Sequence, residues 1–203
     1  KYNKKLVLLS PSQKEISDHQ AICVEMGAEM KFKRIAAMPV LNQHAKKWAE
    51  SNNAFFIPLG LRHELVTAAA VKVAHDLAEK HGYPEEVWSA ISTGVLQRSL
   101  QIAWPDAKFN GVAVARNIKK GERGIAEIWS HPKAFTQDVD PQYNPPFPSA
   151  MNYDAKAWEF MTKHGSPGAW FWNVGGDPKP KDINTKSLTK SERAWGEILE
   201  TDK

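Results

Sequence analysis

The pattern of hydrophobic and polar positions along the chain predicts alternating strands and helices joined by short turns. Short apolar runs that end in turn residues predict strands, whereas apolar positions recurring every three or four residues predict helices. The predicted strands are residues 5–10, 28–35, 54–57, 87–91, 109–115, 125–129 and 168–174. The predicted helices are residues 14–26, 39–51, 62–80, 95–103 and 153–164. This alternation predicts an α/β fold, a Rossmann-like three-layer sandwich with a mainly parallel sheet.

The domain organisation follows from length and from where the alternation stops. A chain of 203 residues with 42% hydrophobic residues can bury one good core, so we expect a single α/β domain over residues 1–176. Five prolines and few aliphatic residues between 130 and 150 predict a Pro-rich loop or lid. Residues 177–203 are mostly charged or polar and predict a C-terminal tail with a short helix near 192–199.

One strand–turn–helix unit carries the strongest chemical signal. The apolar run Val87–Ile91 breaks at Ser92-Thr93-Gly94 and continues into the helical pattern of 95–103. Such a turn directs unpaired backbone N–H groups and the positive end of a helix dipole at one point, which suits a phosphate or a carboxylate. The alternative is an ordinary turn in which Ser92 or Thr93 caps the helix.

The order of elements and several short motifs resemble the fold type II pyridoxal-phosphate enzymes. These are the relatives of tryptophan synthase β, cysteine synthase and aminocyclopropane-carboxylate deaminase. The motifs that carry the resemblance are Gly27-Ala-Glu29, Ala54-Phe-Phe-Ile-Pro-Leu-Gly60, Ser92-Thr-Gly-Val-Leu96 and Phe109-Asn-Gly-Val-Ala-Val114. The resemblance covers roughly residues 5–176.

This resemblance implies a cofactor, pyridoxal phosphate, and residues that would hold it. Its phosphate would lie on the turn, and its pyridine ring near Asn173 and Gly175. The phosphate residues are Ser92, Thr93, Gly94, Val95 and Leu96, of which the last two stand where the family commonly has Gly and Thr.

The resemblance also implies a catalytic lysine that this sequence does not match. In the family, the Schiff-base lysine and the loop that holds the substrate carboxylate precede the strand matched here by Leu6–Leu9. We therefore assign no catalytic residue in this chain, and expect the lysine to come from another segment or another chain.

Two functions follow from the resemblance. The first is a pyridoxal-phosphate-dependent lyase or β-replacement enzyme of amino acid metabolism, acting as a homo-oligomer on an amino acid or a related amine. The alternative is a non-catalytic or repurposed relative that binds a phosphate-bearing ligand, a nucleic acid or a protein partner. A lysine in a Ser/Asn/Gly-rich context in an upstream reading frame would favour the enzyme.

Other side chains have both a functional and a plain structural interpretation. Arg98 and Arg116 lie at the carboxyl ends of predicted strands, where open α/β sheets bind ligands, so both are candidates for contact with an anion. The alternative is that both are solvated surface residues. Lys156 is the lysine best placed for a cleft, although a solvated helix lysine is the simpler prediction. Trp170 and Trp172 alternate with Phe171 and predict a core strand or a stacking platform.

Composition and charge argue against a dedicated nucleic-acid binder, a disulfide-bonded protein and a membrane protein. The net charge of +4 comes from interspersed charges, and contact with nucleic acid is indicated only weakly, by the basic stretches 119–123 and 179–190. Cys23 is the single cysteine, which excludes an internal disulfide and indicates a reducing compartment. No membrane span, signal peptide or metal-ligand spacing of histidines is present. We therefore expect a cytoplasmic protein without a metal site.

Overall fold

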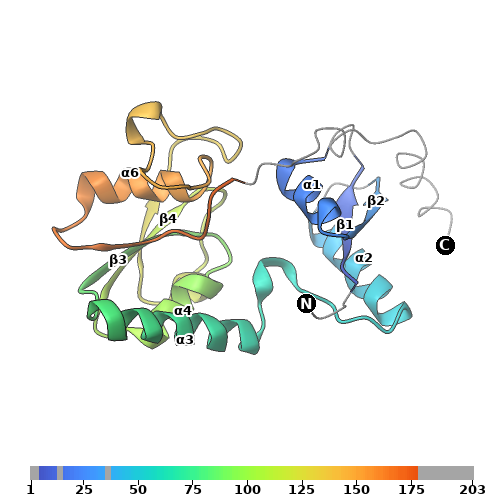
Figure 1. The fold of residues 1–203 in the computed structure, drawn as a ribbon, viewed down its shortest axis with the longest axis horizontal. Helices are drawn as coiled ribbons and strands as arrows, with labels where there is room; N and C mark the ends of the chain where they lie inside the picture. The colour runs from blue at the N-terminus through green and yellow to red at the C-terminus, as the bar shows by residue number, and fades with distance from the viewer. Residues whose placement is uncertain (1–4, 13–15, 35–37, 178–203) are drawn as a thin grey trace. The chain divides into compact units, whose positions relative to one another are not determined.

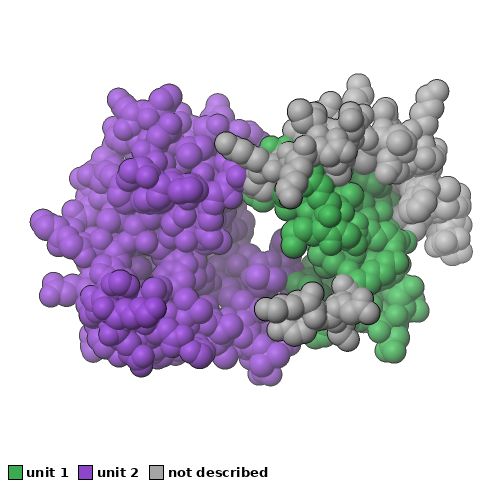
Figure 2. All heavy atoms as spheres, viewed as in Figure 1, with its two compact units in different colours: residues 1–57, 178–203 green, residues 58–177 purple. Residues whose placement is uncertain are grey.

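The computed structural model describes residues 5–12, 16–34 and 38–177. The chain divides into two compact units, residues 1–57 with 178–203, and residues 58–177 (Figure 2). The single domain over residues 1–176 stays a prediction. The tail helix predicted near 192–199 and the basic stretch 179–190 lie outside the described residues.

The first unit contains a two-stranded parallel sheet and two helices. Its elements are β1 (Val7–Pro11), α1 (Asp18–Glu25), β2 (Glu29–Lys33) and α2 (Met38–Ser51). A capping box between Ser17 and Gln20 starts α1, because each residue's side chain accepts a hydrogen bond from the other's backbone N–H. Ile16, Ala21 and Phe32 form a small buried core.

The strand predicted at residues 54–57 is wrong. This stretch has no strand assignment, and Phe55 and Ile57 are 73% and 53% exposed. A short apolar run becomes a strand only when a neighbouring strand completes its hydrogen bonds. Among the described residues, none pairs with this stretch.

The second unit holds the larger sheet. Its elements are η1 (Leu59–Leu61), α3 (Glu64–His81), β3 (Glu86–Ile91), α4 (Val95–Ala103), β4 (Lys108–Ala113), α5 (Lys120–Arg123), β5 (Glu127–Ser130), η2 (Pro141–Tyr143), α6 (Asp154–His164) and β6 (Trp170–Trp172). The Pro-rich segment is irregular apart from η2, as the sequence predicts. One helical turn, α5, forms in the predicted loop 117–124.

The sheet of the second unit is parallel and is covered on both faces. The strand order is β5-β4-β3-β6, with Val87 opposite Phe109 on one side and opposite Trp170 on the other. Helices α3 and α4 cover one face and α6 covers the other (Figure 1). Every residue of β3 is buried, as expected for a central strand between two helical layers. The predicted three-layer α/β sandwich with a parallel sheet is confirmed.

The aromatic strand β6 contributes to both cores. Trp170 and Trp172 pack on the core beneath α3 and α4, where both rings contact Trp104. Phe171 faces the opposite core, beneath α6. The interpretation of this strand as part of the core is confirmed.

The topology places one reversal point in this sheet. From β3 the chain moves outward through β4 to β5, and then returns over α6 to place β6 on the other side of β3. In open parallel sheets, ligands bind outside the carboxyl ends of the strands at such a reversal. The residues that follow β3 and β6 are therefore where a site is expected.

Candidate functional site

The turn after β3 leaves several backbone donors unused. Gly94 adopts φ +77° and serves as the N-cap of α4 without any side-chain cap. The interpretation in which Ser92 or Thr93 caps the helix is therefore wrong. Among the described contacts, no acceptor receives the N–H groups of the turn and of the first residues of α4. These donors belong to Thr93, Gly94, Val95 and Leu96, and they form a cup at the positive end of α4.

A hollow of about 340 Å³ opens beside this cup. Thr93, Gly94 and Val95 line it, together with the side chains of Arg62 and Arg98. Arg98 donates to the Gly121 carbonyl at 3.4 Å. The hollow thus combines backbone donors with cationic side chains, which is the chemistry of an anion site.

Arg116 lies against the cup and already holds a carboxylate. Its guanidinium donates to the Ser92 carbonyl at 2.8 Å and to both oxygens of Glu122 at 2.8 and 2.9 Å. Arg62 donates to Glu122 as well, at 2.6 Å. Hydrogen bonds from Arg116, supported by the Lys119 N–H, lower the pKa of Glu122 to about 2. Glu122 is therefore a carboxylate at any physiological pH.

A second group of unsatisfied polar atoms follows β6 and begins α6. Asp154 is 2% exposed, and its Oδ2 accepts the Val174 N–H at 3.3 Å while Oδ1 has no described partner. The Asn173 amide donates to the Pro148 carbonyl at 2.9 Å, which leaves its buried Oδ1 without a described donor. The buried hydroxyl of Ser149 has no described partner either.

Burial changes the acidity of this carboxyl group. Desolvation raises the pKa of Asp154 to about 6, opposed by hydrogen bonds from the backbone of Val174 and Gly175. A buried carboxylate of this kind is stabilised by any ligand that brings a hydrogen-bond donor or a positive charge. The unsatisfied atoms on this side of the site are thus mainly acceptors, whereas those of the cup are donors.

Tyr153 joins the two groups. Its phenol interacts with the Ser92 side chain of the cup, and Tyr153 immediately precedes Asp154. Burial and the neighbouring Asp154 raise the pKa of Tyr153, opposed by Ser92 and Arg116. Tyr153 therefore links the donors after β3 to the acceptors at the start of α6.

A second hollow of about 500 Å³ lies beside the acceptor group. Phe147, Phe171 and Asn173 line it, together with Gly175 and Gly176. Phe147 and Phe171 also pack against Trp158, at ring distances of 5.1 and 5.4 Å. This hollow offers an apolar, aromatic wall.

Known structures share the fold of this chain. An ACC deaminase homologue matches with a TM-score of 0.64 at 15% identity, over 84% of this chain and 65% of the homologue. Cysteine synthase from Entamoeba histolytica matches with a TM-score of 0.56 at 14% identity, over 100% of this chain and 71% of the synthase. Maize serine racemase matches with a TM-score of 0.53 at 14% identity, over 96% of this chain and 70% of the racemase.

The fold is that of the fold type II pyridoxal-phosphate enzymes. The resemblance seen in the sequence is confirmed at the level of the fold. No family model and no curated protein matches the chain. The chain spans slightly less than two thirds of the ACC deaminase homologue.

The structure places the predicted site residues of this fold type II chain around both hollows. Thr93, Gly94, Val95 and Arg98 line the first hollow, and Ser92 and Arg116 lie beside it. Asn173 and Gly175 line the second. Leu96 contributes its backbone N–H, while its side chain packs on the core beneath α3 and α4.

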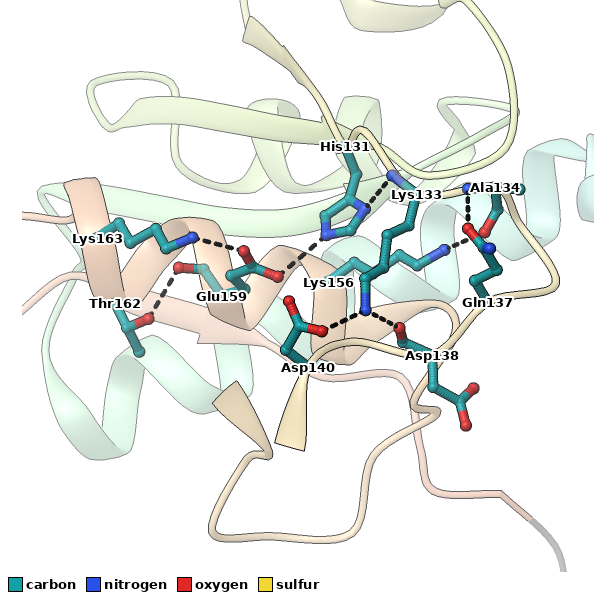
Figure 3. A network of polar contacts seen from close by, with 10 residues as sticks. All are labelled: His131, Lys133, Ala134, Gln137, Asp138, Asp140, Lys156, Glu159, Thr162 and Lys163. Carbon is teal, nitrogen blue, oxygen red and sulfur yellow. Dashed lines mark hydrogen bonds and ion pairs between the residues drawn. The ribbon is translucent and has the colours of Figure 1, made fainter. Parts of the chain in front are cut away.

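The interpretation of Lys156 as a solvated helix lysine is wrong. Its side chain is fully buried, and its amine donates to the Ala134 carbonyl at 2.7 Å. Burial lowers the pKa of Lys156, opposed by Asp138. Figure 3 shows it within a polar network that includes the buried pair of His131 and Glu159 at 3.1 Å. This network fastens the Pro-rich segment to α6, so we assign Lys156 a structural role.

Tyr153, Asp154 and Glu122 are the site residues that the sequence did not reveal. Asp in the first turn of a helix is a common favourable charge, so Asp154 gave no sign of its burial. Glu122 lies in a stretch that reads as a solvated polar loop. In the described chain no three His, Cys, Asp or Glu side chains gather as metal ligands would. No described helix is long and apolar enough to cross a bilayer.

Proposed function

We propose that this chain binds pyridoxal phosphate at the sheet reversal and takes part in lyase or β-replacement chemistry on an amino acid or a related amine. One observation carries the proposal. Unused backbone donors follow β3, and unused acceptors lie at the start of α6 and directly after β6, the strand next to β3 in the sheet. Pyridoxal phosphate has the matching polarity, with a phosphate at one end and a ring nitrogen that can carry a proton at the other.

The residues present fit the cofactor. The backbone N–H groups of 93–96 and the guanidinium of Arg116 would hold the phosphate. Asp154 Oδ1, which is buried without a described partner, would accept a hydrogen bond from the protonated ring nitrogen. Asn173 and the apolar wall of Phe171 would border the ring. Val95 and Leu96 present the same backbone donors as the commoner Gly and Thr.

The chain's own residues would then tune the bound group. Pyridoxal phosphate acts as an electron sink for a carbanion next to the reacting nitrogen. A carboxylate at Asp154 would keep the ring nitrogen protonated, because the buried charge is stabilised by the opposite charge beside it. Tyr153, held by Ser92, would fix the position of the first turn of α6 relative to the cup. The catalytic lysine would come from outside the described residues.

The resemblance extends the proposal to the rest of the molecule. We propose a homo-oligomer that works in the cytoplasm, and a Pro-rich segment 130–150 that acts as a lid. The substrate would carry an amino group, since the neighbours include enzymes named for the amino acids cysteine and serine.

A spectroscopic titration tests the proposal. Pyridoxal phosphate added to the purified chain should give an induced circular dichroism band in the visible range, and pyridoxal, which lacks the phosphate, should bind at least about tenfold more weakly. Ser92→Asp should abolish the band because it adds a negative charge to the cup. Ser130→Asp, at an exposed serine ending β5, is the matched control and should bind normally.

The alternative function gives a different result. Equal binding of pyridoxal and pyridoxal phosphate, unaffected by Ser92→Asp, would contradict the proposed cofactor site. Borohydride reduction and peptide mapping complete the test. Labelling scattered over exposed lysines would point to a binding module without this chemistry.

A further inference from the structure

Glu122 occupies the arginines that a phosphate in the cup would use. Its two carboxylate oxygens receive two hydrogen bonds from Arg116, one from Arg62 and one from the Lys119 N–H. A forked pair of donors from arginine holds carboxylates and phosphates in the same manner. The Glu122 side chain is only 12% exposed, whereas those of Arg116 and Arg62 are 40% and 53% exposed.

The segment that carries Glu122 is fastened across the first turns of α4. The backbone carbonyl oxygen of Glu122 lies so close to Gly94 that a Cβ atom on Gly94 would be 2.0 Å from it. Gln101 of α4 donates to the Arg123 carbonyl at 2.8 Å and accepts the Ile125 N–H at 3.2 Å. Glu122 therefore stands at the mouth of the hollow that Gly94, Val95 and Arg98 line.

We infer that Glu122 is an internal competitor of the cofactor's phosphate for Arg116 and Arg62. This inference rests on the proposed function. A phosphate that enters the cup takes over the guanidinium donors and displaces the Glu122 carboxylate, which then loses its bond to the Lys119 N–H. Three arginines, Arg62, Arg98 and Arg116, and two carboxylates, Glu64 and Glu122, leave one net positive charge in the resting site. Only a ligand with more than one negative charge, such as a phosphate ester, gains enough attraction to complete this exchange.

The exchange makes Glu122 a residue that sets specificity. Removal of its charge frees both arginines for any anion. Glu122→Gln should therefore bind pyridoxal phosphate and inorganic phosphate about tenfold more tightly than the unmodified chain. The preference for doubly charged phosphate over a singly charged anion such as acetate should shrink.

Glu79→Gln is the matched control for this variant. Glu79 is an exposed glutamate near the carboxyl end of α3, and it does not line the hollow. Its substitution should change the dissociation constant by less than about twofold, since an exposed charge is screened. Calorimetric titration of the unmodified chain and both variants with pyridoxal phosphate and inorganic phosphate measures the effect. Unchanged or weaker binding by Glu122→Gln, or an equal gain in Glu79→Gln, overturns the inference.

Trypsin tests the displacement in the unmodified chain, without relying on a variant that folds. Lys119 and Lys120 are exposed, and the Glu122 carboxylate caps their helical turn through the Lys119 N–H. Saturating inorganic phosphate, which cannot modify lysine, should accelerate cleavage after Lys119 and Lys120, and slower or unchanged cleavage contradicts the displacement.

The two proposals fail in different ways. If Glu122→Gln tightens inorganic phosphate tenfold while pyridoxal phosphate binds no better than inorganic phosphate, the competitor role holds and the cofactor assignment fails. If pyridoxal phosphate binds well in every form and Glu122→Gln makes no difference, the cofactor assignment holds and the competitor role fails.

Discussion

The carboxylate of Asp154 accepts the backbone N–H of Val174 at 3.3 Å. This contact joins the first turn of α6 to the residue that follows β6 by two positions. It uses one carboxylate oxygen and leaves the other buried without a described partner. The folded chain without ligand therefore carries an acceptor that a ligand can satisfy.

Asp154 should make stability depend on pH. Its pKa is raised from 3.8 to about 6, so between these values the folded chain holds a proton that the unfolded chain releases. The free energy of unfolding should therefore fall as pH rises through this window, by about 3 kcal/mol. Urea unfolding across the window should show this fall in the unmodified chain and lose it in Asp154→Asn. The control Asp76→Asn, on the exposed side of α3, should show the same fall as the unmodified chain. If Asp154→Asn and the unmodified chain had parallel pH profiles, burial would not raise the pKa of Asp154.

Glu86 should stabilise the opposite end of the sheet. Its buried carboxylate accepts hydrogen bonds from Trp88, Asn110 and Ser166. Burial acts to raise the pKa of Glu86, but hydrogen bonds from Ser166 and Trp88 hold it below its usual value. Glu86→Gln should lower the free energy of unfolding at neutral pH by about 2 kcal/mol.

The pH dependence of this effect has a definite sign. A lowered carboxyl pKa stabilises the folded chain above the usual value of 4.5, and that contribution is lost as pH falls below it. The difference between Glu86→Gln and the unmodified chain should shrink in acid. Glu85→Gln, at the exposed neighbour, is the control and should change stability by less than about 0.5 kcal/mol. A control effect as large as that of Glu86→Gln would contradict the assignment.

Gly94 should tolerate no side chain. A Cβ at this position meets the Glu122 carbonyl, and φ +77° is unfavourable for alanine. Gly94→Ala should lower the free energy of unfolding by about 2 kcal/mol or more and displace the segment around Glu122. Gly121→Ala is the matched control, because a Cβ there meets nothing within 4 Å. Thermal unfolding compares the two, and equal midpoints would refute the close contact at the cup.

Lys156 should contribute to stability through its buried stem and amine. Lys156→Ala removes the packing and leaves the Ala134 carbonyl without its donor, so the free energy of unfolding should fall by about 3 kcal/mol. Lys156→Met keeps most of the volume and should lose about 1 kcal/mol. Lys80→Ala tests an exposed helical lysine and should be nearly neutral. If Lys156→Ala were equally neutral in chemical unfolding, the side chain would be solvated after all.

The sequence predicted the second unit well because its signals are local. The apolar run of β3, the turn at Ser92–Gly94 and the periodicity of α4 each specify an element without reference to distant residues. The prediction of a strand at 54–57 was wrong because a strand also needs a neighbouring strand, which a local pattern does not reveal. The prediction that Lys156 is solvated was wrong for a similar reason, since burial of a lysine is decided by the segment that packs over it.

The candidate site also has a part that local sequence predicts and a part that depends on distant contacts. The cup was predicted from one continuous stretch, because backbone donors at a strand–turn–helix need only local geometry. Asp154 and Glu122 were missed because their roles arise from contacts with Val174, Arg116 and Arg62, which are 6 to 60 residues away in the chain.

Backbone amide shifts of the ¹⁵N-labelled chain test the central claim most directly. Titration with pyridoxal phosphate should move the N–H signals of Thr93, Gly94, Val95 and Leu96 the most, because the phosphate becomes their acceptor. Those of Val174 and Gly175 should move next, as Asp154 gains a partner. If these six signals stay in place while those of exposed lysines shift, pyridoxal phosphate does not bind at the sheet reversal.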